Sequence, residues 1–496
     1  MTAVRTVLLA GGRVIDPGTG HDGVADVLIR GDRIAKVRQA GSAAPDGALV
    51  IDATGRIVGP GFVDLHSHVH SIAGQRLQAL DGVTTALDLE SGLLPIERAY
   101  ERAAAEGRPL NYGFSASWTM ARGETLSGRV FDGDPFGSLD LLGDPAWQAD
   151  SSATQLRSWL GRLETELAGG ALGIGVLMGY APRTDPAEYR AVARLAAAAG
   201  APTFTHVREI IESDPTTPVD GTVEVAQAAM DFGGRVHHCH VNSSSRRHVD
   251  RTLATIERAR AGGAAITVEA YPYGAGSTAV GAAFLAPEAL PAWDLRPGNI
   301  VLVATGERLR DDAHLRQVRR ADPGALCIVE FLDERDESDA ALLRRPLAHP
   351  DGIVASDAMH IEWPDGRVDT RQWPLPPGGR THPRTAGTFA RSLRVMVRER
   401  ALWTWSEAFR RCSWLPARVL DDIAPAASRK GHLAPGSDAD VVVIDPGRVT
   451  DQATYLDPTR PSSGVEQLLV SGQLVVRDGE IVADAYPGRG LRGEAG

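Results

Sequence analysis

Lysine and cysteine are scarce in this 496-residue chain. Fifty of the 52 basic residues are arginine, and the two lysines are Lys36 and Lys430. The three cysteines, Cys239, Cys327 and Cys412, form no CxxC pair. Such few and scattered thiols exclude a disulfide framework and a cysteine-ligated zinc cluster. They fit a reducing compartment, so we expect a cytoplasmic protein.

Long apolar runs and an excess of basic charge are also missing. The N-terminal apolar run is short and is broken by Gly-Gly and arginine, unlike a secretory signal or a membrane span. The formal net charge of -11 argues against nucleic acid as the main partner and against a basic membrane-binding face. We therefore expect a small-molecule substrate, and neither nucleic acid nor membrane as a partner. The sequence leaves the oligomeric state open, a homo-oligomer included.

The two ends of the chain show the same pattern. Residues 1–58 and 429–496 alternate apolar and polar residues in short runs separated by Gly, Asp and Pro. This pattern is typical of strands joined by turns. We expect the two ends to pair into one small β-sandwich domain.

The middle of the chain, 59–428, repeats a strand followed by a helix. Eight such repeats predict an α/β fold of the (β/α)8 TIM-type barrel class. The competing architecture, a doubly wound open sheet, lacks support because no Gly-rich phosphate-binding motif follows the first strand. The stretches 119–152 and 280–350 are expected to be insertions. The predicted strands are 61–68, 84–90, 111–118, 172–178, 203–207, 235–241, 266–271 and 352–356.

The first predicted barrel strand carries the segment GFVDLHSHVH. Side chains alternate between the two faces of a strand, so Asp64, His66, His68 and His70 share one face. Two imidazoles at positions i and i+2 on an inward face can bind one metal ion. We therefore predict His66 and His68 as metal ligands.

Two later strands also end in histidine. His206 ends the strand TFTH and is predicted as a further metal ligand, and the next strand reads RVHHCHVN. Alternation groups His238 with His240 on one face. We favour His240 as the ligand because it lies nearer the barrel mouth, and His238 is the alternative. His237 and His248 are expected to face helices or the surface.

Asp357 ends the eighth predicted strand, in GIVASDA. Residues at the C-terminal ends of barrel strands build the active site of such enzymes. An Asp after Ser can also cap a helix. Because histidines end three other strands, we predict that Asp357 acts in catalysis, as a general acid and base.

This arrangement resembles the amidohydrolase superfamily, in particular its D-aminoacylase (N-acyl-D-amino-acid deacylase) branch. The resemblance rests on the histidine and aspartate pattern and on EAYPYGAGST, THPRTAGTFARSL, WLPARVL and the C-terminal ATYLDPTRPSSGVEQLLVSGQLVVRDG. It implies zinc, one ion or two, and hydrolysis of a linear amide such as an N-acyl-D-amino acid, with N-acyl-D-glutamate as one candidate. It also implies that Tyr271, Ser277 and Arg384 bind the substrate carboxylate.

The chain departs from the family at the metal-bridging position. Many members use a carboxylated lysine, but both lysines here fall in the predicted β-domain. D-aminoacylases use a cysteine at the end of strand two, where this chain has GVTTALDLESG. Glu90 shares the face of Asp88 and ends the strand, whereas Ser91 aligns with the cysteine but is a poor zinc ligand. We predict Glu90 as the metal ligand, because a carboxylate can supply the missing oxygens.

Two further residues are candidates for substrate binding. Asn242 replaces a lysine of the family just after the strand-six histidines. Arg208, beside His206, is expected either to hold a substrate carboxylate such as a D-glutamate side chain or to pair with Glu209 or Glu212.

Two other functions compete with this hypothesis. One is a cyclic-amide hydrolase of the hydantoinase or dihydroorotase type, which uses the same metal scaffold. The other is a non-catalytic barrel that serves as an assembly scaffold. Such scaffolds generally lose metal ligands, and here all the predicted ligands are present.

Overall fold

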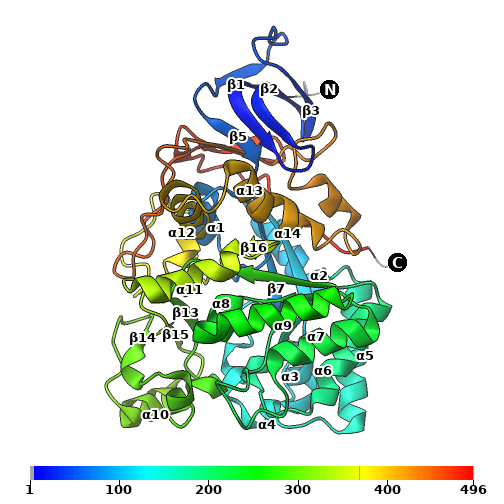
Figure 1. Ribbon diagram of the computed structural model, residues 1–496, viewed down its shortest axis with the longest axis vertical. Coiled ribbons are helices and arrows are strands. Elements are labelled where there is room, and N and C mark those ends of the chain that lie inside the picture. The colour runs from blue at the N-terminus through cyan, green and yellow to red at the C-terminus, as the bar shows by residue number, and fades with distance from the viewer. Residues whose placement is uncertain (1–4, 368, 495–496) are drawn as a thin grey trace.

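The computed structural model describes residues 5–367 and 369–494. Its centre is an eight-stranded parallel sheet with helices outside it (Figure 1). Every strand lies within or overlaps one of the eight predicted strands, so the prediction of a (β/α)8 barrel is confirmed. In sheet order the strands are β16 (Gly352–Val354), β12 (Ile266–Ala270), β11 (Val236–His238), β10 (Thr203–His206), β9 (Ile174–Leu177), β8 (Asn111–Ser117), β7 (Val83–Leu93) and β6 (Phe62–Asp64).

The two ends of this sheet, β6 and β16, meet just past their C-terminal residues. Ser67 pairs with Ala358 in a parallel bridge, and the backbone N–H of His68 donates to the Ala358 carbonyl at 2.8 Å. The barrel therefore closes at the level where the predicted site residues leave their strands.

The helices that follow the strands have well-defined ends. In α7, for example, the Asp220 side chain accepts from the N–H groups of Thr222 and Val223, and the helix ends at Gly233 with a φ of 67°. Both features are common helix ends. The main barrel helices are α1 (Ile72–Leu80), α2 (Ile96–Glu106), α3 (Trp118–Leu126), α5 (Ala153–Ala168), α6 (Pro186–Ala198), α7 (Gly221–Phe232), α8 (Val241–Ser245), α9 (Val249–Ala261), α11 (Glu337–Ala348) and α12 (Arg384–Ser392).

Both ends of the chain contribute to one nine-stranded sheet, as expected. The hydrogen-bonded path runs without a break through strands of both segments, and β4 pairs with β1 beside it. Apolar side chains of the two segments share one core. The domain boundaries at 58/59 and 428/429 stay a prediction. The strands are β1 (Thr6–Asp16), β2 (His21–Arg30), β3 (Arg33–Gln39), β4 (Leu49–Asp52), β5 (Ile57–Pro60), β17 (Val441–Ile444), β18 (Val465–Val470), β19 (Gln473–Arg477) and β20 (Glu480–Ile481).

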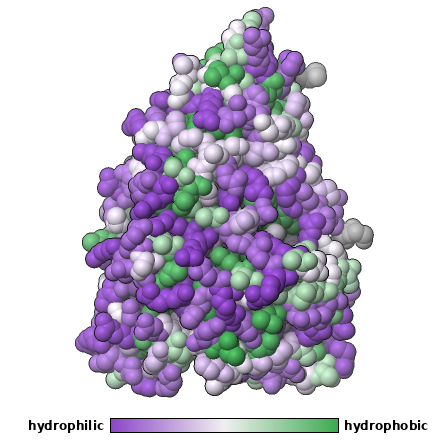
Figure 2. Space-filling view, in the orientation of Figure 1, coloured by the Kyte–Doolittle hydropathy of each residue, from purple (hydrophilic) through white to green (hydrophobic). Residues whose placement is uncertain are grey.

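A small third sheet lies between β12 and β16 in the chain. It has the order β13 (Ala275–Ala279), β15 (Leu326–Glu330), β14 (Ile300–Leu302) and carries α10 (Asp312–Ala321). It fills much of the predicted insertion 280–350 and lies at the lower left of Figure 1. The face in Figure 2 is mostly hydrophilic, with hydrophobic residues in small groups. Within the described ranges, every helix is too short or too polar to cross a bilayer.

Candidate active site

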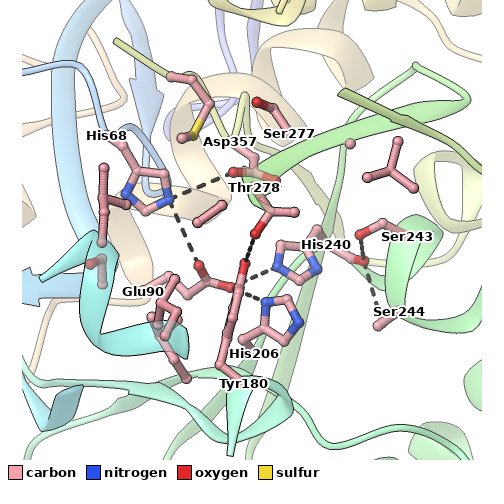
Figure 3. Close-up of a pocket in the computed structure, with 18 of the residues that line it drawn as sticks. His68, Glu90, Tyr180, His206, His240, Ser243, Ser244, Ser277, Thr278 and Asp357 are labelled. Carbon is pink, nitrogen blue, oxygen red and sulfur yellow. Dashed lines mark hydrogen bonds and ion pairs between the residues drawn. The ribbon is translucent and has the colours of Figure 1, made fainter. Parts of the chain in front are cut away.

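A cavity opens where the barrel strands end. Its polar floor is formed by residues that lie near the C-terminal end of five different strands or just after them: His68, Glu90, His206, His240 and Asp357 (Figure 3). In a (β/α)8 barrel this end is where active sites form.

One part of the floor combines His66, His68 and Asp357. The two Nε2 atoms of the histidines are 3.1 Å apart. Asp357 Oδ1 lies 3.4 Å from Nε2 of His66 and 3.6 Å from Nε2 of His68. Ligand atoms converging at such distances are arranged to share one cation.

Glu90 connects this group with the other two histidines (Figure 3). Its Oε2 lies 3.2 Å from Nε2 of His66 and 3.7 Å from Nε2 of His68. Its Oε1 lies 3.2 Å from Nδ1 of His206 and 2.6 Å from Nε2 of His240. Each carboxylate oxygen therefore faces a different imidazole pair, which is the arrangement that a bridging ligand needs.

The backbone of β7 directs Glu90 into the cavity. The pairing with β8 shifts between Asp88 and Leu93, so extra residues of β7 bulge out of register around Glu90. Such bulges re-aim side chains and are common beside active sites. Strand β9 approaches closely, since a Cβ on Gly175 would lie 2.3 Å from the Glu90 carbonyl oxygen.

The predicted orientation of the histidines in and after β11 is wrong in part, because alternation does not continue past the end of the strand at His238. His237 points into the barrel, where its Nε2 lies 2.9 Å from Glu269 Oε2, so it faces neither a helix nor the surface. His238 bonds instead to the Cys239 carbonyl and belongs to none of the ligand groups. His240 reaches Glu90 because its φ is 31°, a left-handed conformation that breaks the alternation.

Glu269 is a site residue that sequence reasoning missed. It is fully buried in β12, and its Oε1 accepts from Nδ1 of His66 at 2.5 Å. A carboxylate on the far nitrogen of a metal-binding histidine fixes the ring and its tautomer. An acidic residue inside the apolar strand ITVEA was the available signal.

Asp88 plays a similar part on the opposite side. Its two oxygens lie 3.2 Å from Nδ1 of His68 and 2.8 Å from Nε2 of His70. Burial would raise the pKa of Asp88, but the two imidazoles lower it below its ordinary range. Asp88 and His70 line the cavity, as do Ser91 and the unpredicted His360.

The donor set fits a zinc ion, or two. Imidazole nitrogens and carboxylate oxygens are zinc's common protein ligands. Three groups made only of these donors have ligand atoms within 4.8 Å of one another: His66–His68–Glu90, Glu90–His206–His240 and His66–His240–Asp357; a fourth group, His66–Cys239–Glu269, includes a thiol. Lys36 lies in β3 and Lys430 bonds Asp440 at 2.7 Å, so neither lysine reaches the site.

Electrostatics favours charged carboxylates at this floor. Burial alone would raise the pKa of Glu90, but the surrounding imidazoles lower it well below its ordinary value. Burial would lower the pKa of His66, yet the carboxylates of Glu90, Asp357 and Glu269 raise it well above its ordinary value. The negative charge at this floor would attract a cation.

Beside the floor lies a second group, Tyr271, Ser277 and Arg384. Arg384 Nη2 forms an ion pair with Asp357 Oδ1 at 2.8 Å, and its guanidinium stacks over the Tyr271 ring at 4.7 Å. Its Nε and Nη1, the Tyr271 hydroxyl and the Ser277 hydroxyl are buried and lack a hydrogen-bond partner within the described part of the chain. Unsatisfied buried donors are costly unless a ligand completes them.

The structure places Arg208 and Asn242 outside the cavity wall, and Arg208 requires a correction. Its Nε donates to Glu224 at 2.8 Å and its Nη1 to the Pro182 carbonyl. The ion-pair partner of Arg208 is thus Glu224 and neither Glu209 nor Glu212, while its Nη2 is buried without a hydrogen-bond partner within the described residues; substrate binding by Arg208 stays a prediction. Asn242 lies behind Tyr271 and accepts from that residue's N–H at 3.3 Å.

Comparisons with known proteins agree with this site. The chain is 31% identical to an N-acyl-D-glutamate deacylase of Alcaligenes xylosoxydans xylosoxydans, over 99% of this chain and 97% of the relative. It is 27% identical to an N-acyl-D-aspartate deacylase of the same organism, over 98% and 94%. The solved N-acyl-D-glutamate deacylase of Bordetella bronchiseptica, complexed with zinc and a phosphonate inhibitor, superposes with a TM-score of 0.75 at 26% identity, covering 99% and 100%.

The family comparison gives the same result. The sequence profile described as "Amidohydrolase family" matches residues 49–320, which is more than half of the chain. The resemblance stated from the sequence motifs is thereby confirmed, and the chain belongs to the amidohydrolase family.

Proposed function

We propose that this protein is a zinc-dependent hydrolase of linear amides, acting on N-acyl-D-amino acids. The observation that carries the proposal is the placement of the unsatisfied donors of Arg384, Tyr271 and Ser277 directly beside the Glu90-centred histidine cluster. A substrate with a carboxylate next to its amide bond matches this spacing. The named activities of the similar deacylases support the same substrate class.

The residues divide into three roles. His66, His68, Glu90, His206 and His240 would hold zinc, with Asp357 beside them. Zinc bound there would lower the pKa of water and polarise the scissile carbonyl. Arg384 would hold the substrate carboxylate through its unpartnered nitrogens, with Tyr271 and Ser277 as neighbouring hydroxyl donors, since a guanidinium–carboxylate pair makes strong, charge-assisted hydrogen bonds.

Asp357 is the group placed to move the proton. Its Oδ1 faces the two histidines and is ion-paired with Arg384 Nη2 at 2.8 Å, which would hold the carboxylate in place. In hydrolysis Asp357 would accept a proton from the attacking water and deliver it to the nitrogen of the leaving amine. The C–N bond breaks, and a carboxylic acid and a D-amino acid are released.

The competing functions make different demands on the same site. Hydantoin has no free carboxylate for Arg384, Tyr271 and Ser277, whereas dihydroorotate has one, so only a substrate screen separates the dihydroorotase type. A scaffold would not need the ligand groups. The partner is accordingly a small molecule; the cytoplasmic location and a homo-oligomer stay predictions.

The test is a hydrolysis screen with the zinc-loaded enzyme. The substrates are N-acetyl-D-amino acids, their L enantiomers, and hydantoin and dihydroorotate. We expect release of free D-amino acid and little turnover of the L and cyclic compounds. Preferred turnover of a cyclic amide would support the hydantoinase-type function instead.

A further inference from the structure

We propose that the cavity holds one anion-binding position, at Arg384, and that its remaining wall is an apolar subsite for a large uncharged group of the substrate. This inference rests on the proposed function and narrows its substrate class. Substrates with an apolar side chain or acyl group would be favoured, and those with an acidic side chain, such as D-glutamate or D-aspartate, disfavoured.

An aromatic wall extends from the metal-ligand cluster. The ring of His206 is stacked with Phe284, with centroids 6.0 Å apart, and Phe284 is stacked with Trp293 at 4.9 Å. Tyr180 packs against Phe284 at 5.2 Å, and its hydroxyl is bonded to Thr278 at 2.7 Å. These rings line the cavity, so a group placed beside the cluster meets aromatic surface.

The rest of the wall is also largely apolar. Residues from the 135–142 segment, from β15 and from the segment after β16 complete it: Phe136, Leu139, Leu142, Val329, Phe331 and Met359. Apolar walls of this kind favour groups that bury hydrophobic surface.

Within residues 5–367 and 369–494, no arginine or lysine is among the residues that line the cavity. Arg384 lies directly behind two lining residues, over the Tyr271 ring and beside the Ser277 carbonyl. Arg246 lies behind Trp293, with its guanidinium carbon 3.6 Å from the ring centroid. Its charge is already compensated, since Nη2 donates to Glu209 at 3.0 Å and to the Ser213 hydroxyl.

Glu209 itself lines the cavity. A second substrate carboxylate would therefore approach a buried carboxylate and a neutralised arginine. Like charges brought together at a desolvated site are costly. A relative at 31% identity is an N-acyl-D-glutamate deacylase, so the two proteins would differ in the side chain that they accept.

The first experiment compares two substrates that differ mainly in charge. With zinc-loaded enzyme, kcat/KM for N-acetyl-D-glutamate should lie roughly 10²-fold or more below that for N-acetyl-D-glutamine, because only the former adds a second carboxylate. A value for glutamate equal to or above that for glutamine would overturn the inference while leaving the deacylase function intact.

Two further substrates identify which part of the molecule fills the apolar subsite. N-acetyl-D-phenylalanine carries the large apolar group on the amino acid, and N-phenylacetyl-D-alanine carries it on the acyl side. We expect at least one of them to exceed N-acetyl-D-alanine in kcat/KM by roughly 10-fold or more. If neither does, there is no apolar subsite.

A charge change in the wall tests the same point in the protein. Glu209→Gln leaves the charge of Arg246 uncompensated, so the discrimination between the glutamate and glutamine substrates should shrink by roughly 10-fold or more. Glu212→Gln is the matched control: Glu212 pairs with Arg251 away from the cavity wall and should leave the discrimination unchanged. Equal discrimination in both variants would overturn the role of Glu209.

Product binding separates this inference from the proposed function. Calorimetry with the zinc-loaded wild-type enzyme should show D-phenylalanine binding more tightly than D-glutamate. If no linear amide is hydrolysed, the proposed function fails, and the binding order still tests the subsite. Tighter binding of D-glutamate would overturn the inference, whatever the turnover.

Discussion

Replacing Glu90 by glutamine removes one charge from the centre of the ligand cluster with almost no change in volume. In the native chain each carboxylate oxygen faces two imidazole nitrogens, at 3.2 and 3.7 Å for Oε2 and at 3.2 and 2.6 Å for Oε1. The glutamine keeps one acceptor oxygen, but its NH2 group cannot bind a cation. The metal position beside one of the two imidazole pairs therefore loses its carboxylate ligand.

The expected loss of zinc affinity can be bounded. Mutating a residue that only orients a ligand costs about 10- to 100-fold in metal affinity. Loss of a ligand should cost at least the upper value, about 100-fold or about 2.8 kcal/mol. Because four histidines and Asp357 remain, we expect the loss to fall mainly on one site.

The assay is zinc titration against a competing chelator, with metal content measured after dialysis. Glu362→Gln is the control, because Glu362 lies outside the ligand groups. Circular dichroism would establish that both variants keep their helical content. A Glu90→Gln protein with native zinc content, native affinity and native activity would refute the bridging role, and Asp88 or Ser91 would become the next candidates.

Three other changes test neighbouring parts of the account. Asp357→Asn should keep zinc but lower kcat by roughly 10²-fold or more, because the amide cannot accept a proton; near-native turnover would assign the proton transfer to another residue. Arg384→Lys should lower kcat/KM for an N-acyl-D-amino acid more than for its carboxamide, since one ammonium cannot replace the planar fork, and equal losses would indicate a purely structural role. Burial lowers the pKa of His382 well below its ordinary value of about 6.5, so the unfolded chain gains a proton that the folded chain resists as pH falls. The free energy of unfolding should thus fall as the pH drops below about 6.5, where an exposed histidine takes up its proton. In urea titrations His382→Gln should lose part of this acid sensitivity, and an unchanged pH dependence would contradict the reasoning.

The barrel could be predicted because each of its strands has a recognisable local sequence pattern. Apolar runs bounded by turn residues recur eight times, and residues at strand ends must meet at one rim. For the same reason the sequence alone predicts that His66, His68, His206 and Asp357 lie together. Glu90 followed from strand parity and from the shortage of lysine and cysteine.

The predictions fail where a side chain's position depends on residues outside its own strand. Alternation holds only inside a strand, and the left-handed backbone of His240 reversed the assignment of His237 and His238. Arg208 lies two residues after His206, but its ion-pair partner is Glu224 on α7 and neither of the glutamates near it in sequence. Partners on separate elements, such as Glu269 with His66, become neighbours only when the barrel closes.

The central claim is that zinc held by this cluster is required to release a D-amino acid from its N-acyl derivative. The most direct measurement is the initial rate of D-leucine release from N-acetyl-D-leucine by one enzyme preparation, measured as prepared with zinc, after chelation, and after zinc is added back. We expect the rate to disappear on chelation and to return with zinc, with one acetate formed for each D-leucine. An unchanged rate in the chelated enzyme, or no release in any of the three states, would contradict the claim.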